Sequence, residues 1–235
     1  MHGSAPAPDP DQAVARARRL ADRLDPRLRY HDARHTFCEV LPAARSLARA
    51  AGVGPDLRDV LLVAAAFHDL GFLALPDGGG RFDLPPVRGP DGRGHERAGV
   101  ALMRRELAPL GYDEGTLDRI ARTILATRLP QRPASLEERL LADADLSLLG
   151  ARTFPLRNEE LRLERLALGG APVPRAVWAR KQSDFLLRHR FATEVAERAY
   201  GPGRARNARL LRSYARTGRT PAPGRSSLAR GARRP

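Results

Sequence analysis

The stretch VLLVAAAFHDLG (residues 60–71) places a histidine and an aspartate, His68 and Asp69, directly after eight apolar residues. An imidazole and a carboxylate are unfavourable in an apolar interior unless a partner compensates for their lost hydration. A divalent metal is a common partner, because it binds a neutral imidazole and an ionised carboxylate together. Neighbouring side chains on a helix are about 100° apart, so both can reach an ion over the helix end. The stretch therefore predicts a buried helix that ends at a metal site; the alternative is a partly buried histidine followed by a capping aspartate.

Two further segments carry side chains that could complete such a site. YHDARHT (residues 30–36) offers two histidines upstream, and LLADADLSLLG (residues 140–150) offers two aspartates downstream. Each precedes or lies on an expected helix of its own. Imidazole and carboxylate ligands together suit zinc, manganese, iron or cobalt, and they leave coordination positions open for water and substrate.

In this order, the three segments resemble the HD superfamily of metal-dependent phosphohydrolases, whose pattern is His…His-Asp…Asp; the resemblance covers roughly residues 30–150. It implies an all-α fold, an HD-domain helical bundle, and one divalent transition metal (Mn, Fe, Co, Ni or Zn). The implied activity is hydrolysis of a phosphate ester or anhydride of a nucleotide-like substrate by a metal-activated water. The alternative is a non-catalytic HD module that binds a nucleotide or a partner. The implied metal ligands are His35, His68, Asp69 and Asp145.

In the two flanking segments, a neighbouring residue competes with the preferred ligand. His35 followed by a threonine and a helix is similar to the family's first motif, whereas His31 would lie in the preceding turn. Asp143 and Asp145 diverge by roughly 200° on a helix, so both cannot face one ion. The residues around Asp145 resemble the last motif of cyclic-nucleotide phosphodiesterases in this superfamily, which leaves Asp143 as an acceptor behind the ligands or, preferably, a solvated acid. Pro42 falls within the helix expected after His35 and predicts a kink or a late helix start there.

Further candidates for chemistry follow the central motif. His95 and Glu96 begin an expected helix, and the His-x-x-x-Gly spacing resembles the third motif of the HD-GYP branch, in which that histidine serves a second metal. The histidine pair that this branch needs one helix later is absent, and Arg128 stands in that region. We therefore expect one metal, with His95 and Glu96 facing the substrate or the nucleophilic water, and with Asp69 also able to take the proton. Arg128 is either a phosphate-binding residue, because its guanidinium is a planar fork, or an ordinary surface arginine.

The spacing of apolar residues predicts helices throughout the chain, separated by glycines and prolines. The expected helices lie at about 11–24, 34–51, 55–70, 95–109, 114–127, 135–149, 156–168, 174–190 and 192–200.

The 235 residues are expected to divide into a leader, a domain and a tail. Residues 1–10 are predicted to be a disordered leader, 11–200 an HD domain with a C-terminal helical extension, and 201–235 a basic, largely disordered tail. The predicted tail holds ten arginines and no acid, so it carries most of the net charge of +14; the rest of the chain has 31 basic residues against 27 acidic ones. We expect this tail to contact polyanions nonspecifically. The other expected partner is a small phosphorylated substrate of the nucleotide class.

Cysteine content and hydropathy predict a cytoplasmic location. Cys38 is the only cysteine, which excludes an internal disulfide and favours a reducing compartment; it is expected to be a small buried side chain. No apolar run reaches the roughly 18 residues of a membrane span. The first ten residues lack the basic start and apolar stretch of a secretory signal.

Overall fold

The structure is a computed structural model that describes residues 8–75 and 84–218. These residues form helices and no β-strand, which confirms the predicted all-α fold, and none of the helices is long and apolar enough to cross a bilayer. The elements in chain order are α1 (Pro10–Ala21), the π-helical segment η1 (His35–Val40), α2 (Leu41–Ala50), α3 (Pro55–Phe67), the 3₁₀ segment η2 (Leu70–Ala74), α4 (His95–Leu107), η3 (Ala108–Leu110), α5 (Glu114–Leu125), α6 (Leu136–Asp145), η4 (Leu146–Gly150), α7 (Phe154–Ala167), α8 (Arg175–Arg188) and α9 (Glu194–Thr217).

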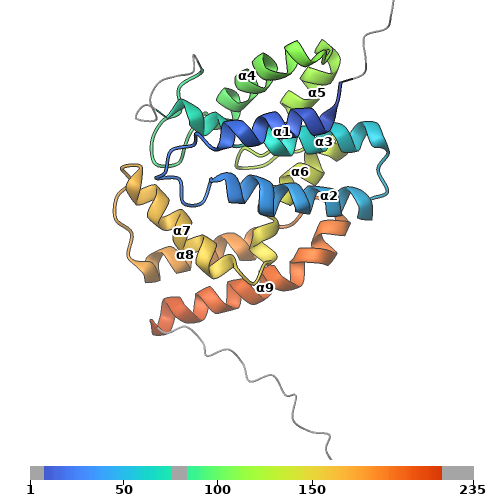
Figure 1. The fold of residues 1–235 in the computed structure, drawn as a ribbon. Coiled ribbons are helices and arrows are strands. Elements are labelled where there is room, and N and C mark those ends of the chain that lie inside the picture. The colour runs from blue at the N-terminus through green and yellow to red at the C-terminus, as the bar shows by residue number, and fades with distance from the viewer. Residues whose placement is uncertain (1–7, 76–83, 219–235) are drawn as a thin grey trace, which may run out of the picture.

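Helix α3 is the centre of the bundle. All eight of its residues from Val60 to Phe67 are buried, and the helix packs against α1, α2, α5 and α6. Helices α4 and α5 lie together at one end of the molecule, whereas α7, α8 and α9 lie together at the other end (Figure 1). Because α3 has no polar face along these eight residues, its carboxyl end places the following His68 and Asp69 inside the protein.

The helix expected at 34–51 is interrupted near Pro42, as predicted. Residues His35–Val40 form a π-helical turn, and the backbone N–H of Leu41 donates to the carbonyl of Thr36 five residues back. Helix α2 then begins at Leu41, which places Pro42 in a first turn where its missing N–H is tolerated. Short π-helical segments are often found at functional sites, and this one begins with His35.

The C-terminal helix is longer than predicted. Helix α9 replaces the helix expected at 192–200 and runs to Thr217, so the prediction that the disordered tail begins at residue 201 is wrong for residues 201–217. Gly201-Pro202-Gly203 lies within the helix, although these residue types usually end one. Residues 219–235 of the predicted tail lie outside the described residues.

Tertiary packing on η4 explains why α9 continues through this break. A Cβ atom on Gly203 would overlap the carbonyl group of Gly150, so the two backbones are in direct contact. One turn later, the side-chain amide of Asn207 donates to the carbonyl oxygens of Leu149 and Ala151, both at 2.8 Å. These contacts hold the helix in place where local propensity does not favour it.

Two smaller expectations differ from the structure. Helix α1 begins at Pro10, the last residue of the predicted leader, with Asp9 as its N-cap; residues 1–7 lie outside the described residues. Cys38 is exposed, so the expectation of a buried side chain is wrong. Its neighbours His35, Phe37 and Val40 occupy the buried face of η1, which leaves Cys38 on the outer face.

Candidate metal centre

His68 and Asp69 lie at the carboxyl end of α3, where the chain turns into η2. The Nδ1 atom of His68 donates to the carbonyl oxygen of Ala65 at 2.8 Å. Because a carbonyl oxygen can only accept, Nδ1 carries the proton, and a neutral ring presents the lone pair of Nε2 on its opposite side. The side chain of Asp69 turns back to the same place, so that its Oδ2 lies 3.1 Å from Nε2 of His68.

Two other helices bring one further side chain each to this point. His35 comes from the first position of η1, and its Nε2 lies 3.3 Å from Asp145 Oδ1 and 3.7 Å from Asp69 Oδ2. Asp145 is the last residue of α6, and its Oδ1 lies 3.6 Å from His68 Nε2. The four atoms therefore form a closed ring in which two nitrogens alternate with two oxygens. Three of the four residues, His35, His68 and Asp145, offer ligand atoms that all lie within 4.8 Å of one another.

The residues present fit a divalent metal ion. Ligand atoms about 2.1 Å from one ion lie about 3.0 Å apart at right angles and about 4.2 Å apart on opposite sides, which spans the distances in the ring. Nε2 of His68 and Oδ2 of Asp69 are buried and have no hydrogen-bond partner. Buried polar atoms without a partner are unusual in proteins, and a cation inside the ring would contact both of these atoms.

The charges of the ring also favour a cation. Burial raises the pKa of Asp145, but the imidazoles of His35 and His68 beside it outweigh burial and lower that pKa to about 2. Burial likewise opposes ionisation of Asp69, yet attraction to His68 holds its pKa well below the usual range. Burial lowers the pKa of His35, but hydrogen bonds to Asp145 and Glu39 raise it to about 9. Both carboxylates are therefore ionised, and in the metal-free protein a histidine proton takes the place of the cation.

The second oxygen of Asp69 faces a different group of side chains. Its Oδ1 lies 3.5 Å from Nε2 of His95, whose Nδ1 donates to the carbonyl oxygen of Gly92 at 2.7 Å. The His95 ring stacks on Phe72 with 4.4 Å between centroids, and Phe72 also stacks on His31 at 4.7 Å. Asp69 thus joins the nitrogen–oxygen ring to an aromatic cluster made of His31, Phe72 and His95.

The structure does not bring the other two candidates into contact with Asp69. The buried carboxylate of Glu96 lies 3.8 Å from Nδ1 of His95, on the side of that ring opposite to Asp69. Among the contacts that the structure describes, Glu96 reaches the site through His95. Arg128 follows α5 and is exposed, and its guanidinium forms no hydrogen bond or ion pair within the part of the chain that the structure describes.

Asp143 points away from the ring, as the helical spacing predicts, but the expectation that it is a solvated acid is wrong. Its side chain is buried and accepts hydrogen bonds from the backbone N–H of Ala192 (2.6 Å) and of Thr193 (2.9 Å). The hydroxyl of Thr193 also donates to it at 2.6 Å. Because Thr193 is the N-cap of α9, Asp143 fastens the start of that helix to α6.

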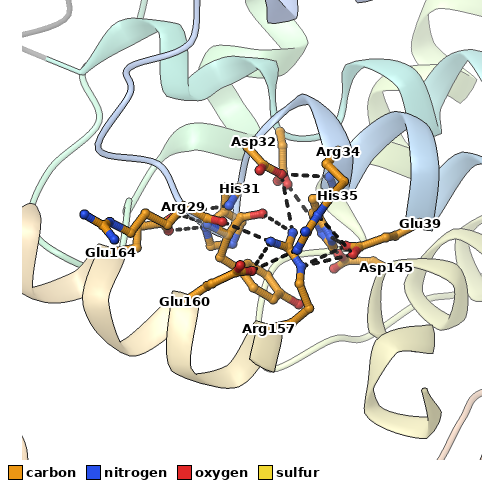
Figure 2. Close-up of polar contacts among 12 residues, drawn as sticks. Arg29, His31, Asp32, Arg34, His35, Glu39, Asp145, Arg157, Glu160 and Glu164 are labelled. Carbon is orange, nitrogen blue, oxygen red and sulfur yellow. Dashed lines mark hydrogen bonds and ion pairs between the residues drawn. The ribbon is translucent and has the colours of Figure 1, made fainter. Parts of the chain in front are cut away.

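Sequence reasoning missed three charged residues beside the site (Figure 2). Oε2 of Glu39 lies 3.1 Å from Nδ1 of His35, and the buried Arg157 donates to the same oxygen at 3.2 Å. Oε1 of Glu164 lies 2.5 Å from Nδ1 of His31, which holds that histidine outside the nitrogen–oxygen ring. Glu39 is one helical turn from His35, a spacing that could have identified it. Arg157 and Glu164 are more than 100 residues from their partners and give no local signal.

Comparison with known proteins gives a family. The model of the HD domain matches residues 34–147, a span that begins one residue before His35 and ends two residues after Asp145. HD domains bind divalent metals and are generally metal-dependent hydrolases. No curated protein and no solved structure matches the chain. The match joins the same segments that meet at the nitrogen–oxygen ring, and the chain therefore belongs to the HD-domain superfamily.

Proposed function

We propose that the protein is a phosphohydrolase that holds one divalent transition metal ion (Mn, Fe, Co, Ni or Zn) between His35, His68, Asp69 and Asp145. The observation that carries this proposal is the closed nitrogen–oxygen ring, in which two buried atoms have no other partner. When bound, such an ion supplies a water molecule of lowered pKa and polarises a phosphoryl oxygen.

Asp69 and His95 are the proposed catalytic residues. Oδ1 of Asp69 lies on the side of the carboxylate away from the nitrogen–oxygen ring, 3.5 Å from Nε2 of His95, and is proposed to accept the proton. Burial lowers the pKa of His95, but the hydrogen bond to Asp69 and the charge of Glu96 raise it. A protonated His95 can then donate to the leaving-group oxygen. In this proposal Glu96 stabilises the positive charge of His95 from the Nδ1 side of its imidazole and does not touch the substrate.

The proposed substrate is a small phosphorylated molecule of the nucleotide class. We expect His95, when protonated, to donate from its ring to a phosphate oxygen. Phe72 is buried and packs against the rings of His31 and His95, so it supports these two side chains from behind. Arg128 is proposed to contact a substrate phosphate, for which its planar fork is suited. We also propose a cytoplasmic location, which agrees with a single cysteine in 235 residues.

A turnover screen tests this function. The protein is reconstituted with each metal, and phosphate release and nucleotide turnover are measured with nucleoside mono-, di- and triphosphates and with cyclic nucleotides. His68→Gln should lose metal and turnover together. His189→Gln is the matched control and should keep both, because the His189 ring packs on Phe185 and Phe191 and lies outside the nitrogen–oxygen ring. Equal turnover by His68→Gln would contradict the proposal, whereas tight metal binding without any turnover would favour the non-catalytic alternative.

A further inference from the structure

Arg157 is a buried arginine whose side chain is 1% exposed, and it lies in α7, beyond the residues that match the HD domain. Figure 2 shows its guanidinium surrounded by acceptors from the segment that leads into η1. Its three nitrogens donate to the carbonyl oxygens of Arg29 (2.9 Å) and Tyr30 (2.7 Å) and to the carboxylates of Asp32 (3.4 Å), Glu39 (3.2 Å) and Glu160 (2.5 Å). A guanidinium has five N–H groups, so this set of acceptors can satisfy every one of them.

Three of these partners also contact His35. Oε2 of Glu39 lies between Nε of Arg157 (3.2 Å) and Nδ1 of His35 (3.1 Å). Oδ1 of Asp32 accepts from the backbone N–H of His35 at 2.9 Å. The Tyr30 ring has its centroid 4.8 Å from the guanidinium carbon of Arg157 and 4.8 Å from the centroid of the His35 ring. Arg157 therefore holds the groups that contact one ring nitrogen, the backbone and one face of His35.

We propose that Arg157 is a positioning residue of the metal site: it holds Glu39 against Nδ1 of His35, so that Nε2 points at Asp69 and Asp145. The inference rests on the proposed function. A carboxylate at Nδ1 keeps the proton on that nitrogen and leaves Nε2 free to bind metal. Removing such a partner lowers metal affinity by about 10- to 100-fold.

The position requires an arginine for a geometric reason. Its acceptors lie on several sides of one planar group, and a lysine has three donors on a single nitrogen that cannot reach all of them. It follows that α7 belongs to the working metal site, although the family match ends at residue 147.

The test compares Arg157→Lys with the unsubstituted full-length chain. Zinc affinity is measured by competition with a coloured chelator, and the visible spectrum is recorded after substitution with Co²⁺. We expect zinc binding to weaken about 10- to 100-fold and the cobalt spectrum to shift, while the far-ultraviolet circular dichroism stays unchanged. A folded Arg157→Lys protein with unchanged zinc affinity and cobalt spectrum would overturn the inference.

Arg204→Lys is the matched control for the loss of a buried arginine. Arg204 is 7% exposed, and it donates to the carbonyl of Leu186 and to Glu197, which do not contact His35. Arg204→Lys should keep the zinc affinity and the cobalt spectrum. If it weakens zinc binding as much as Arg157→Lys does, the effect is general destabilisation and the positioning role is wrong.

A double-mutant cycle with Glu39→Gln tests the route from Arg157 to His35. If both residues act through one path, the double variant loses no more zinc affinity than the more damaging single variant. Additive losses would show separate effects and overturn the inference. Glu39→Gln alone tests the same path if Arg157→Lys does not fold, because it leaves the other four acceptors of Arg157 in place.

A readout without metal separates this inference from the proposed function. If the unsubstituted protein binds no metal, the proposed function fails, but the hydrogen bond at Nδ1 of His35 can still be measured by ¹⁵N nuclear magnetic resonance of the imidazole. We expect an Nδ1 proton that exchanges slowly with solvent in the unsubstituted protein and rapidly in Arg157→Lys. The same slow exchange in both proteins would overturn the positioning role.

Discussion

At the scale of single residues, two aspartates two positions apart direct their carboxylates to different parts of the molecule. Asp145 directs Oδ1 to the nitrogens of His35 and His68, whereas Asp143 directs its carboxylate to the start of α9. Side chains two positions apart on a helix point in directions that differ by roughly 200°, so the two carboxylates cannot contact the same partners. The role proposed for Asp145 is metal binding, whereas the contacts of Asp143 support stability, so the two substitutions should give different results.

We expect Asp145→Ala to lose the metal, because it removes one oxygen of the ring. Asp143→Ala should keep the metal but lower the free energy of unfolding by about 1–3 kcal/mol, because two backbone N–H groups lose a buried acceptor. Metal analysis and thermal unfolding of the two purified variants check this. Loss of metal in Asp143→Ala, with retention in Asp145→Ala, would transfer the ligand to Asp143.

His95 gives a second prediction at this scale. It contacts Oδ1 of Asp69 and not the nitrogen–oxygen ring, so His95→Ala should keep about one metal per chain. Turnover should fall about 100-fold or more, as expected for the loss of a general acid. Metal content after extensive dialysis and kcat for the best substrate are the measurements. Two metals in the unsubstituted protein and one in His95→Ala would instead show a two-metal site of the HD-GYP kind.

At the scale of elements, the distance between η2 and α4 sets the position of His95 relative to Asp69. A Cβ atom on Gly71 would overlap the backbone carbonyl of His95 and the backbone nitrogen of Gly99. Gly71 follows Asp69 by two residues, so the close backbone contact places the first residue of α4 beside the metal site. A glycine is needed here because the neighbouring atoms are backbone and cannot rotate away.

We expect Gly71→Ala to force η2 and α4 apart, to lower the free energy of unfolding by at least about 1–3 kcal/mol, and to reduce turnover by displacing His95. Gly54→Ala is the control: nothing lies within 4 Å of its Cβ position, and its φ of −71° suits alanine. That variant should stay within about 1 kcal/mol of the unsubstituted protein. Equal effects of the two substitutions in thermal unfolding and kcat would contradict the role given to Gly71.

At the scale of the whole molecule, α7, α8 and α9 form a second group of helices, which contacts the segments that carry the candidate site. Asp143 accepts from the backbone N–H groups that lead into α9, Arg157 donates to Glu39, and Glu164 contacts His31. Five residues of α9 beyond Tyr200 are buried: Gly201, Arg204, Asn207, Ala208 and Leu211. The C-terminal half is therefore part of the folded unit, and its boundary lies well beyond the predicted residue 200.

Two truncations check this boundary. A stop after Gly218 should leave the Tm and the turnover of a small nucleotide unchanged, because the described contacts end there. It removes five arginines, so retention on heparin should weaken, and the difference should vanish at high salt. A stop after Tyr200 should give a chain that unfolds readily, since it removes buried residues of α9. Lost turnover in a folded, metal-loaded protein that ends at Gly218 would mean that the last residues reach the active site.

Metal removal gives a prediction for the stability of the whole chain. A ligand that binds only the folded state stabilises it, by about 2.7 kcal/mol when present at 100 times its Kd. Chelation should therefore lower the Tm, and added metal should restore it. His68→Gln should show the same Tm with and without chelator. If chelator does not change the Tm of the unsubstituted protein, this would argue against a metal held between η1, α3 and α6.

The sequence by itself determined the all-α fold, the family and the order of the site segments. These conclusions depend on local features: the apolar run that ends at His68, the spacing of two acids on one helix, and a proline near the end of η1. Such features act over a few residues, and their physical consequences do not depend on distant parts of the chain. The segments carrying His35, His68 and Asp145 do meet, as the family resemblance implied.

Only the tertiary structure decided what surrounds those segments. Arg157 and Glu39 are 118 residues apart, and no local pattern relates a buried arginine to a carboxylate at that separation. The hydrogen bonds of Asp143 depend on a helix start about 50 residues later, and α9 passes Pro202 because Gly203 packs on Gly150. Contacts between distant segments outweigh local propensity at these places, because buried polar groups must find a partner wherever the fold provides one.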